Sequence, residues 1–202
     1  MGNTTSKTTT MTKATFEPFT ERQKATITEA FSRPDIYDYL AKNNMKTYVI
    51  TLSKKFPINH NRKGQPTDFG GAFLKGQGQK NSESMFSKVH TIRANYPLWE
   101  KRIQEVQQGT ACLSIRQWTD KPYRSKQIEI ARLTKDNGVG IQKLQFRYCD
   151  SLSDYAIDDL CMFGGTELAN NDGLRYRDWA NWFSSYDLTK PIAIIHFTQF
   201  RY

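Results

Sequence analysis

The sequence predicts an α+β fold, in which many short strands form a small barrel with short helices inserted between them. Several short segments alternate between apolar and polar side chains and are rich in Val, Ile, Thr and aromatic residues, a pattern typical of strands. Two or three other segments carry apolar residues at helical spacing. The 202 residues are enough for one globular domain with extensions.

The N-terminal part of the chain is predicted to lie outside this domain. Residues 1–15 are rich in Thr and Ser and have few apolar side chains, so burial cannot offset the entropy lost on ordering. We expect a flexible tail there. Residues 16–46 show the apolar spacing of short amphipathic helices, with a break before Pro34. They predict a helical extension in front of a barrel domain that spans residues 47–202.

The first part of the barrel domain is predicted to contain one strand and one short helix. Residues 47–52 are β-branched and alternating, as expected for a strand. Residues 59–68 are polar and contain Gly and Pro, which favours a loop. A short helix is expected within residues 70–76, and residues 77–87 form a polar insertion.

The segment Lys88 to Arg93 combines a possible base, a hydroxyl nucleophile and a guanidinium group in one predicted strand. Strict alternation would place Lys88 and His90 on one face and Thr91 and Arg93 on the other. Lys88 and Thr91 can therefore share a site only if the strand begins after Lys88 or carries a bulge there. The alternative is an ordinary strand whose Lys and Arg side chains remain solvated.

The middle of the chain is predicted to form a helix followed by three strands. Residues 97–106 have apolar side chains at helical spacing, and Gly109 follows where a C-terminal cap is expected. Alternation then predicts strands over residues 111–118, 127–133 and 141–148.

The last elements are predicted to be one helix over residues 167–186 and a strand over residues 191–200. Trp179 and Trp182 have helical spacing and few basic neighbours, so we interpret them as core residues of that helix.

The charge of the chain favours a polyanionic partner. The formal charge is +9 and the pI is about 9.4. Residues 75–132 hold 11 Lys plus Arg against 5 acidic residues, a net +6, whereas residues 147–202 hold 5 against 8, a net −3. This asymmetry indicates a basic face, although a generally basic solvated surface would give the same counts.

Cysteine and histidine placement predicts neither a disulfide framework nor a metal site. The three Cys residues lack CxxC spacing, and the three His residues are far apart in the sequence. We expect no cofactor. Because no apolar run is long enough to span a bilayer and no signal segment is recognised, we expect a soluble, cytoplasmic protein without a membrane partner.

The order of these elements resembles the ASCH domain, a branch of the PUA-like β-barrel superfamily. The resemblance covers roughly residues 47–202 and depends on the segment Lys88-x-x-Thr91-x-Arg93, because ASCH proteins carry a Gly-x-Lys-x-x-Thr-x-Arg signature. Asp172 and the helix after it complete the pattern. The chain also resembles ASCH-like proteins of gut Bacteroidetes and their phages, which implies a bacterial cell or a phage-infected host.

The resemblance implies specific roles for these residues. PUA-like barrels mostly bind RNA, and small ASCH proteins include an amidohydrolase that removes the acetyl group from acetylcytidine. By this resemblance Lys88 corresponds to the general base, Thr91 to the nucleophile, Asp172 to the acid and Arg93 to a positioning group. A desolvated lysine can lose its proton near neutral pH and activate a neighbouring hydroxyl. His90 is a weaker candidate for substrate binding.

Two departures from the family pattern affect the predicted catalysis. The signature glycine normally lies just before the lysine, whereas here the 77–87 insertion separates Gly76 from Lys88. The acidic residue, usually Glu in hydrolytic members, is Asp172, which is one methylene shorter. Either change could abolish catalysis and leave a protein that only reads a base.

A second group of residues predicts contact with a polynucleotide. Cations of this group would neutralise phosphates, and its aromatic side chains would stack on unpaired bases. The alternative is a hairpin whose Trp packs in the core and whose turn is solvated. The group comprises Arg116, Trp118, Tyr123, Arg124 and Lys126.

We therefore expect a protein that binds RNA or a modified nucleoside. The first alternative is an amidohydrolase that acts on acetylcytidine-type bases. The second is a phage or bacterial interaction or structural protein that uses the N-terminal extension. The oligomeric state is left open by the sequence.

Overall fold

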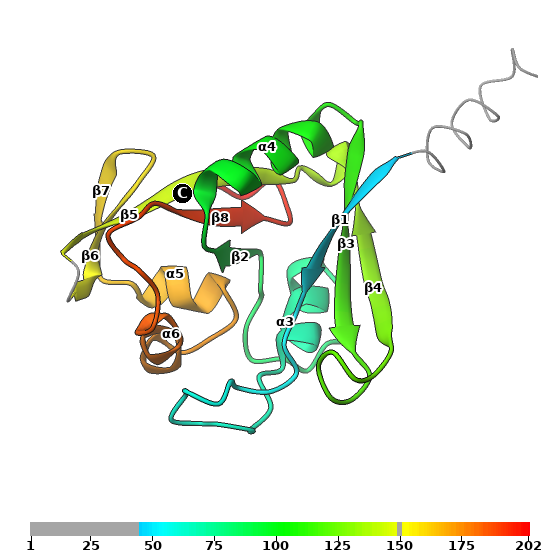
Figure 1. The fold of residues 1–202 in the computed structure, drawn as a ribbon, viewed down its shortest axis with the longest axis horizontal. Coiled ribbons are helices and arrows are strands. Elements are labelled where there is room, and N and C mark those ends of the chain that lie inside the picture. The colour runs from blue at the N-terminus through cyan, green and yellow to red at the C-terminus, as the bar shows by residue number, and fades with distance from the viewer. Residues whose placement is uncertain (1–44, 149–150) are drawn as a thin grey trace, which may run out of the picture. The chain divides into compact units, whose positions relative to one another are not determined.

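The computed structural model describes residues 45–148 and 151–202, and residues 45–202 form one compact unit. The predicted tail over residues 1–15 and nearly all of the extension over residues 16–46 lie outside the described residues. The described part contains eight strands and four α-helices, which confirms the α+β class (Figure 1). The predicted interaction role of the N-terminal extension also concerns residues that are not described.

The eight described strands form two separate sheets, so the described part of the predicted small barrel is not a closed barrel. The first sheet has the order β1-β3-β4, with bounds β1 Lys46–Thr51, β3 Ala111–Trp118 and β4 Gln127–Leu133. Strand β1 pairs with β3 in parallel, and β3 pairs with β4 in antiparallel orientation. Alternation along a segment predicts a strand but not its partner, which is why the closure of the sheet could not be read from the pattern.

The second sheet is antiparallel and has the order β2-β8-β5-β6-β7. Strand β8 lies between β2 and β5, and all five of its residues are buried. It covers only the first half of the predicted strand over residues 191–200. The bounds are β2 His90–Arg93, β5 Gly140–Tyr148, β6 Ser151–Ile157, β7 Leu160–Phe163 and β8 Ile192–His196.

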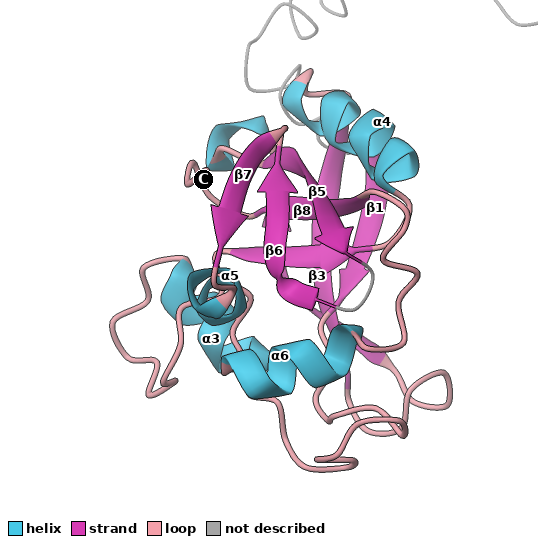
Figure 2. Ribbon diagram, turned by 90° about the vertical axis from the view of Figure 1, so that its left-hand side faces the viewer, coloured by secondary structure: helices cyan, strands magenta, loops and turns pink. Residues whose placement is uncertain are grey.

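Helix α4, Tyr96–Gln107, holds the two sheets together. It packs against β3 of the first sheet and against β5 and β8 of the second, through Trp99, Ile103 and Val106. Figure 2 shows α4 on one side of the strands and α6 on the other. Asn95 caps the first turn by accepting a hydrogen bond from the Leu98 amide. The helix ends at the cap residue Gln108, and Gly109, predicted at the C-terminal cap, follows it with a φ of +78°.

The remaining helices surround the region that precedes β2. Helix α3, Phe69–Gly76, includes the predicted 70–76 segment. The predicted single helix over residues 167–186 is wrong, because the structure has two helices, α5 Thr166–Asn171 and α6 Tyr176–Phe183. Gly173 has a φ of +84°, a left-handed conformation that an α-helix cannot contain, and the helix ends there. Trp179 is fully buried in the core, in agreement with the prediction.

Candidate functional site

Lys88 lies two residues before the start of strand β2, which begins only at His90. The strand therefore starts after Lys88, the condition under which the sequence allows Lys88 and Thr91 to share a site. The Lys88 amide donates to the Ala72 carbonyl oxygen at 2.8 Å, and the Val89 amide donates to the Asn171 carbonyl oxygen at 3.0 Å. These two hydrogen bonds fix the backbone of Lys88 between α3 and α5.

The Lys88 side chain is buried and ion-paired. Its side chain is 1% exposed, and its ammonium donates to the carboxylate of Asp172. The same nitrogen donates to the backbone carbonyl oxygen of Asp172 at 2.5 Å and lies 4.4 Å from the centre of the Phe69 ring. The lysine that the sequence singles out is therefore not a solvated strand residue, and its partner is the acidic residue that the family resemblance indicated.

Burial and ion pairing act in opposite directions on the two ionisable groups. Burial lowers the pKa of Lys88, against the attraction of the Asp172 carboxylate. Burial raises the pKa of Asp172, against the attraction of Lys88 and, more weakly, of Arg93. Moving the proton from the amine to the carboxylate would convert the ion pair into two neutral groups, which burial favours.

The position of Asp172 results from the break between α5 and α6. Asp172 is the C-terminal cap of α5. The family pattern had indicated an acidic residue that opens a helix, and Asp172 does not do so. A carboxylate at a helix C-terminus is electrostatically unfavourable, and the adjacent Lys88 ammonium compensates for it. A Cβ on Gly173 would lie 3.3 Å from the Cβ of Lys88, so this glycine packs closely against the lysine stem.

Lys88, Thr91, Arg93 and Asp172 line one small cavity of about 20 Å³. Thr91 is buried, whereas Arg93 is partly exposed and donates from Nη2 to the Thr51 carbonyl oxygen at 2.9 Å. The volume is enough for about one water-sized group. We call this space the Lys88 cavity.

His90 does not line the Lys88 cavity. Its side chain is fully buried on the opposite face of β2, where Nε2 lies 2.9 Å from the Tyr202 hydroxyl. The Tyr202 hydroxyl also accepts a hydrogen bond from Asn171 at 3.1 Å. His90 and His196 are register partners on β2 and β8, with ring centres 5.7 Å apart. The structure thus separates His90 from Lys88 and Thr91 and places it in a buried aromatic cluster.

Gly76 packs against Lys88 although the insertion separates them in the sequence. A Cβ on Gly76 would lie 2.4 Å from the Lys88 carbonyl oxygen. The 77–87 insertion leaves α3 and returns to it, because Ser82 donates to the Gly71 carbonyl oxygen and Lys75 to the Ser84 carbonyl oxygen. A glycine therefore contacts the lysine backbone despite the departure from the family spacing.

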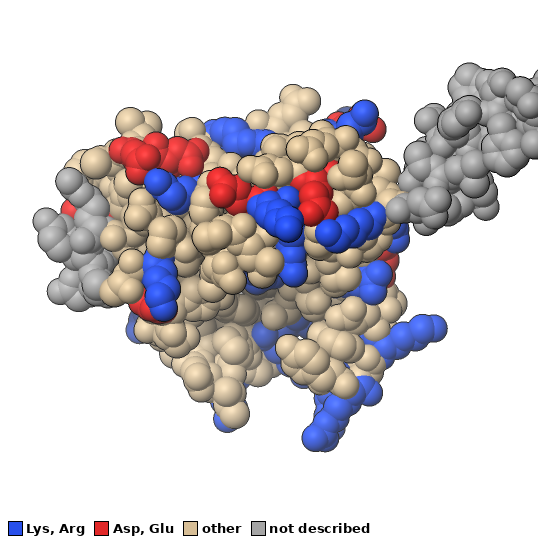
Figure 3. All heavy atoms as spheres, turned by 45° about the horizontal axis from the view of Figure 1, so that its top comes forward, with Lys and Arg blue, Asp and Glu red and all other residues tan. Residues whose placement is uncertain are grey.

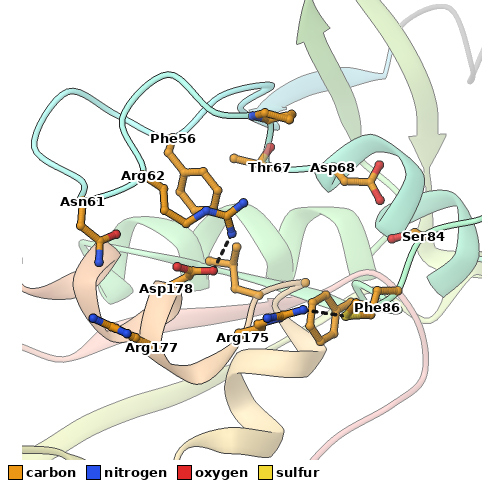
Figure 4. Close-up of a pocket in the computed structure, with 14 residues that line it drawn as sticks. Phe56, Asn61, Arg62, Thr67, Asp68, Ser84, Phe86, Arg175, Arg177 and Asp178 are labelled. Carbon is orange, nitrogen blue, oxygen red and sulfur yellow. Dashed lines mark hydrogen bonds and ion pairs between the residues drawn. The ribbon is translucent and has the colours of Figure 1, made fainter.

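A second, larger cavity of about 530 Å³ adjoins the Lys88 cavity, and Leu174 lines both. We call it the arginine cavity, because three arginines line it (Figure 4). They are Arg62 from the loop before α3, Arg175 from the segment before α6 and Arg177 from α6 itself. The sequence analysis missed all three. Two arginines at the start of a helix, Arg175 and Arg177, could have indicated an anion site from the sequence. Arg62 lies in a polar loop, where no pattern distinguished it.

The predicted polynucleotide contacts lie on the β3–β4 hairpin, and none of them lines either of these two cavities. Trp118 is only partly buried and contacts Tyr123, with ring centres 5.4 Å apart and ring planes tilted by 52°. The alternative of a core Trp118 is therefore wrong. Arg124 and Lys126 are exposed, but Arg116 donates to Ser114 at 2.7 Å and lies 3.9 Å from the Glu129 carboxylate.

The predicted basic face is mixed on the side that Figure 3 shows, where Lys and Arg side chains lie among Asp and Glu side chains. Ion pairs such as Lys46–Glu105 at 2.9 Å and Lys143–Asp159 at 3.0 Å neutralise some of the basic side chains locally. In the described residues, no group of three or more His, Cys, Asp and Glu side chains is placed to hold a metal ion. None of the described helices is long and apolar enough to cross a bilayer.

Comparison of the chain with protein families, curated proteins and solved structures found no match. The ASCH resemblance remains a prediction from the motif.

Proposed function

We propose that the chain binds RNA or a modified nucleoside as an ASCH-type, PUA-like domain, with the Lys88 cavity as the point of base recognition. One observation carries this proposal. The three residues of the Lys-x-x-Thr-x-Arg motif and Asp172, which lies 84 residues beyond Lys88, line the same cavity. A cavity with an amine, a carboxylate and a hydroxyl provides both donors and acceptors for the edge of a nucleobase.

The sizes of the two cavities define how a base would bind. The Lys88 cavity accepts about one water-sized group, so only the end of an exocyclic substituent, such as an amine or a carbonyl oxygen, fits there. The adjoining arginine cavity, at about 530 Å³, is large enough for the ring and sugar. In our proposal the base lies in the arginine cavity and directs its exocyclic group past Leu174 toward Lys88 and Thr91.

The second candidate is hydrolysis of an acylated cytosine-type base, and the burial of Lys88 beside Thr91 favours it. A proton that moves from Lys88 to Asp172 leaves a neutral amine, which can accept the hydroxyl proton of Thr91. The Thr91 oxygen then attacks the acyl carbonyl, and Arg93 stabilises the oxyanion.

The reaction would be completed by loss of the base and by hydrolysis. The C–N bond breaks as Asp172 or Lys88 returns a proton to the exocyclic nitrogen. Water then hydrolyses the Thr91 ester and releases a carboxylic acid. Each step uses only the side chains that line the Lys88 cavity, the substrate and water.

Binding and turnover are tested with acetylcytidine and with an acetylated RNA oligonucleotide. Binding is followed by titration calorimetry and deacetylation by mass spectrometry. Thr91→Val removes the hydroxyl at nearly constant volume, and Thr91→Ser restores a hydroxyl as the matched control. Turnover that Thr91→Ser retains and Thr91→Val loses supports the hydrolase. Binding without turnover supports a reader, and absence of binding to both ligands excludes both functions.

A further inference from the structure

The arginine cavity contains cationic groups that lack an anionic partner. Among the described residues, the only polar contact of the Arg175 side chain is from Nη2 to the Met85 sulfur at 3.8 Å, and Arg177 has none. Arg132, by contrast, is paired with Glu129 at 3.1 Å. Arg175 and Arg177 are exposed, so water solvates both guanidinium groups in the free protein and their charge is available to a ligand.

Arg62 is held in place on the opposite side of this cavity. Its Nη1 donates to Asp178 at 2.7 Å, its Nε donates to Gln65 at 2.9 Å, and its guanidinium stacks on Phe56 at 4.7 Å. Within the described part of the chain, Nη2 of Arg62 makes no hydrogen bond. Figure 4 shows Arg62 and Arg175 on facing sides of the cavity. The guanidinium of Arg62 is thus oriented in advance, with one amino group left for a ligand.

The remaining lining fits an anion that carries a flat ring. The three arginines oppose two carboxylates, Asp68 and Asp178, which leaves a formal charge of +1. Asp178 is already paired with Arg62, and Asp68 lies at the start of α3 (Figure 4). Phe86 is partly exposed and adds aromatic surface on which a base can stack, whereas the Phe56 ring is covered by Arg62 and His60.

We propose that the arginine cavity binds a phosphate group between Arg62 and Arg175, so that the ligand of this protein is a phosphate-bearing nucleotide or polynucleotide and not a free nucleoside. This inference rests on the proposed function, because it names the substrate class of the same site. A phosphate offers acceptor oxygens in several directions and can accept hydrogen bonds from two facing guanidinium groups at once. Arg177, at the rim, would add a longer-range attraction for the next phosphate of a strand.

Four probes test this inference by titration calorimetry: acetylcytidine, its 5′-monophosphate, its 3′-monophosphate and ribose 5-phosphate. The variant is Arg175→Gln, and because this side chain is exposed the substitution should leave the stability of the fold nearly unchanged. The matched control is Lys101→Gln, which removes one positive charge from α4 outside the cavity. We expect at least one monophosphate to bind about tenfold more tightly than the nucleoside, from charge-assisted hydrogen bonds. Arg175→Gln is expected to abolish this difference, and Lys101→Gln to preserve it.

The outcomes separate this inference from the proposed function. If the nucleoside and both monophosphates bind equally, the phosphate site is excluded and base recognition stands. If ribose 5-phosphate binds in a manner that depends on Arg175 but no nucleoside binds, the phosphate site stands and base recognition fails. If none of the four binds, both proposals fail. A phosphate preference that Arg175→Gln leaves unchanged also overturns the assignment.

Discussion

Lys88 and Asp172 are separated by 84 residues, yet the Lys88 ammonium donates to both the carboxylate and the backbone carbonyl oxygen of Asp172. Both side chains are almost completely buried. Two hydrogen bonds to one residue anchor the end of α5 to the start of β2. The pair is therefore a structural connection between distant parts of the chain as well as the centre of the candidate site.

Removing one partner of this pair is expected to destabilise the fold strongly. Lys88→Met leaves the Asp172 carboxylate buried without its cation, at a cost of about 3 to 5 kcal/mol. Asp172→Asn leaves the ammonium unpaired and should cost a similar amount. Urea unfolding of the two variants measures these values.

The double variant Lys88→Met/Asp172→Leu is the control for this prediction. It removes both charges, so its loss of stability should be much smaller than the sum of the single losses. Additive losses would contradict an energetically coupled pair.

Gly76→Ala is expected to destabilise the protein, although alanine is the better helix former. The new methyl group would lie 2.4 Å from the Lys88 carbonyl oxygen, a backbone atom that cannot move without shifting the site. We expect a loss of about 1 to 3 kcal/mol and weaker ligand binding, measured by thermal unfolding and titration calorimetry.

Gly70→Ala in the same helix is the matched control. Its methyl group would lie 2.9 Å from the end of the Gln117 side chain, which can rotate away. Its effect on the free energy of unfolding should be close to zero. Equal losses of stability in the two variants would show that the contact with Lys88 does not cause the effect of Gly76→Ala.

The buried His196 is expected to make the protein less stable in acid. Burial, assisted by the positive charge of Arg201, lowers the pKa of His196 to about 3 from 6.5. Between these values the unfolded state binds the proton and the folded state does not, so stability falls as the pH falls below 6.5. The free energy of unfolding falls by about 1.4 kcal/mol per pH unit in this range. Urea unfolding at pH 7, 6 and 5 measures the slope.

The variant His196→Phe isolates this contribution from the other groups. Burial lowers the pKa of His90 as well, which adds to the loss of stability in acid. The raised pKa of Asp172 has the opposite effect, because its protonation stabilises the folded state as the pH falls. The variant should therefore show a weaker loss of stability in acid than the wild type. Identical slopes would refute the prediction.

Tyr202→Phe is expected to cost about 1 to 3 kcal/mol in the free energy of unfolding. The hydroxyl group is the partner of His90 at 2.9 Å and of Asn171 at 3.1 Å, and its loss leaves both without that bond. Tyr123→Phe, at a side chain that is 91% exposed, serves as the control and should change stability by less than about 0.5 kcal/mol. Similar effects of the two variants would contradict a structural role for the Tyr202 hydroxyl.

Local pattern predicted several elements well, and its failures have physical causes. The strands over residues 111–118 and 127–133 have the predicted bounds, because alternation is a property of each segment alone.

Strands β6 and β7 were not predicted. They are joined by Asp158 and Asp159, which both have positive φ, and this Asp-Asp turn was the available signal. Strand β7 has only four residues, and Leu160 and Phe163 are exposed, so it lacks the pattern of a half-buried strand.

The sequence by itself determined the α+β class, most of the strands and helices, and the spacing of Lys88, Thr91 and Arg93. These features depend on side-chain periodicity and on turn residues within short windows of the chain. Only the tertiary structure decided that the sheets stay separate, that Asp172 contacts Lys88, that His90 contacts Tyr202 and that Arg62 and Arg175 line one cavity. Such relationships are set by the packing of α3, α5 and α6 around the start of β2, and contacts between distant residues leave no periodic signal in the chain.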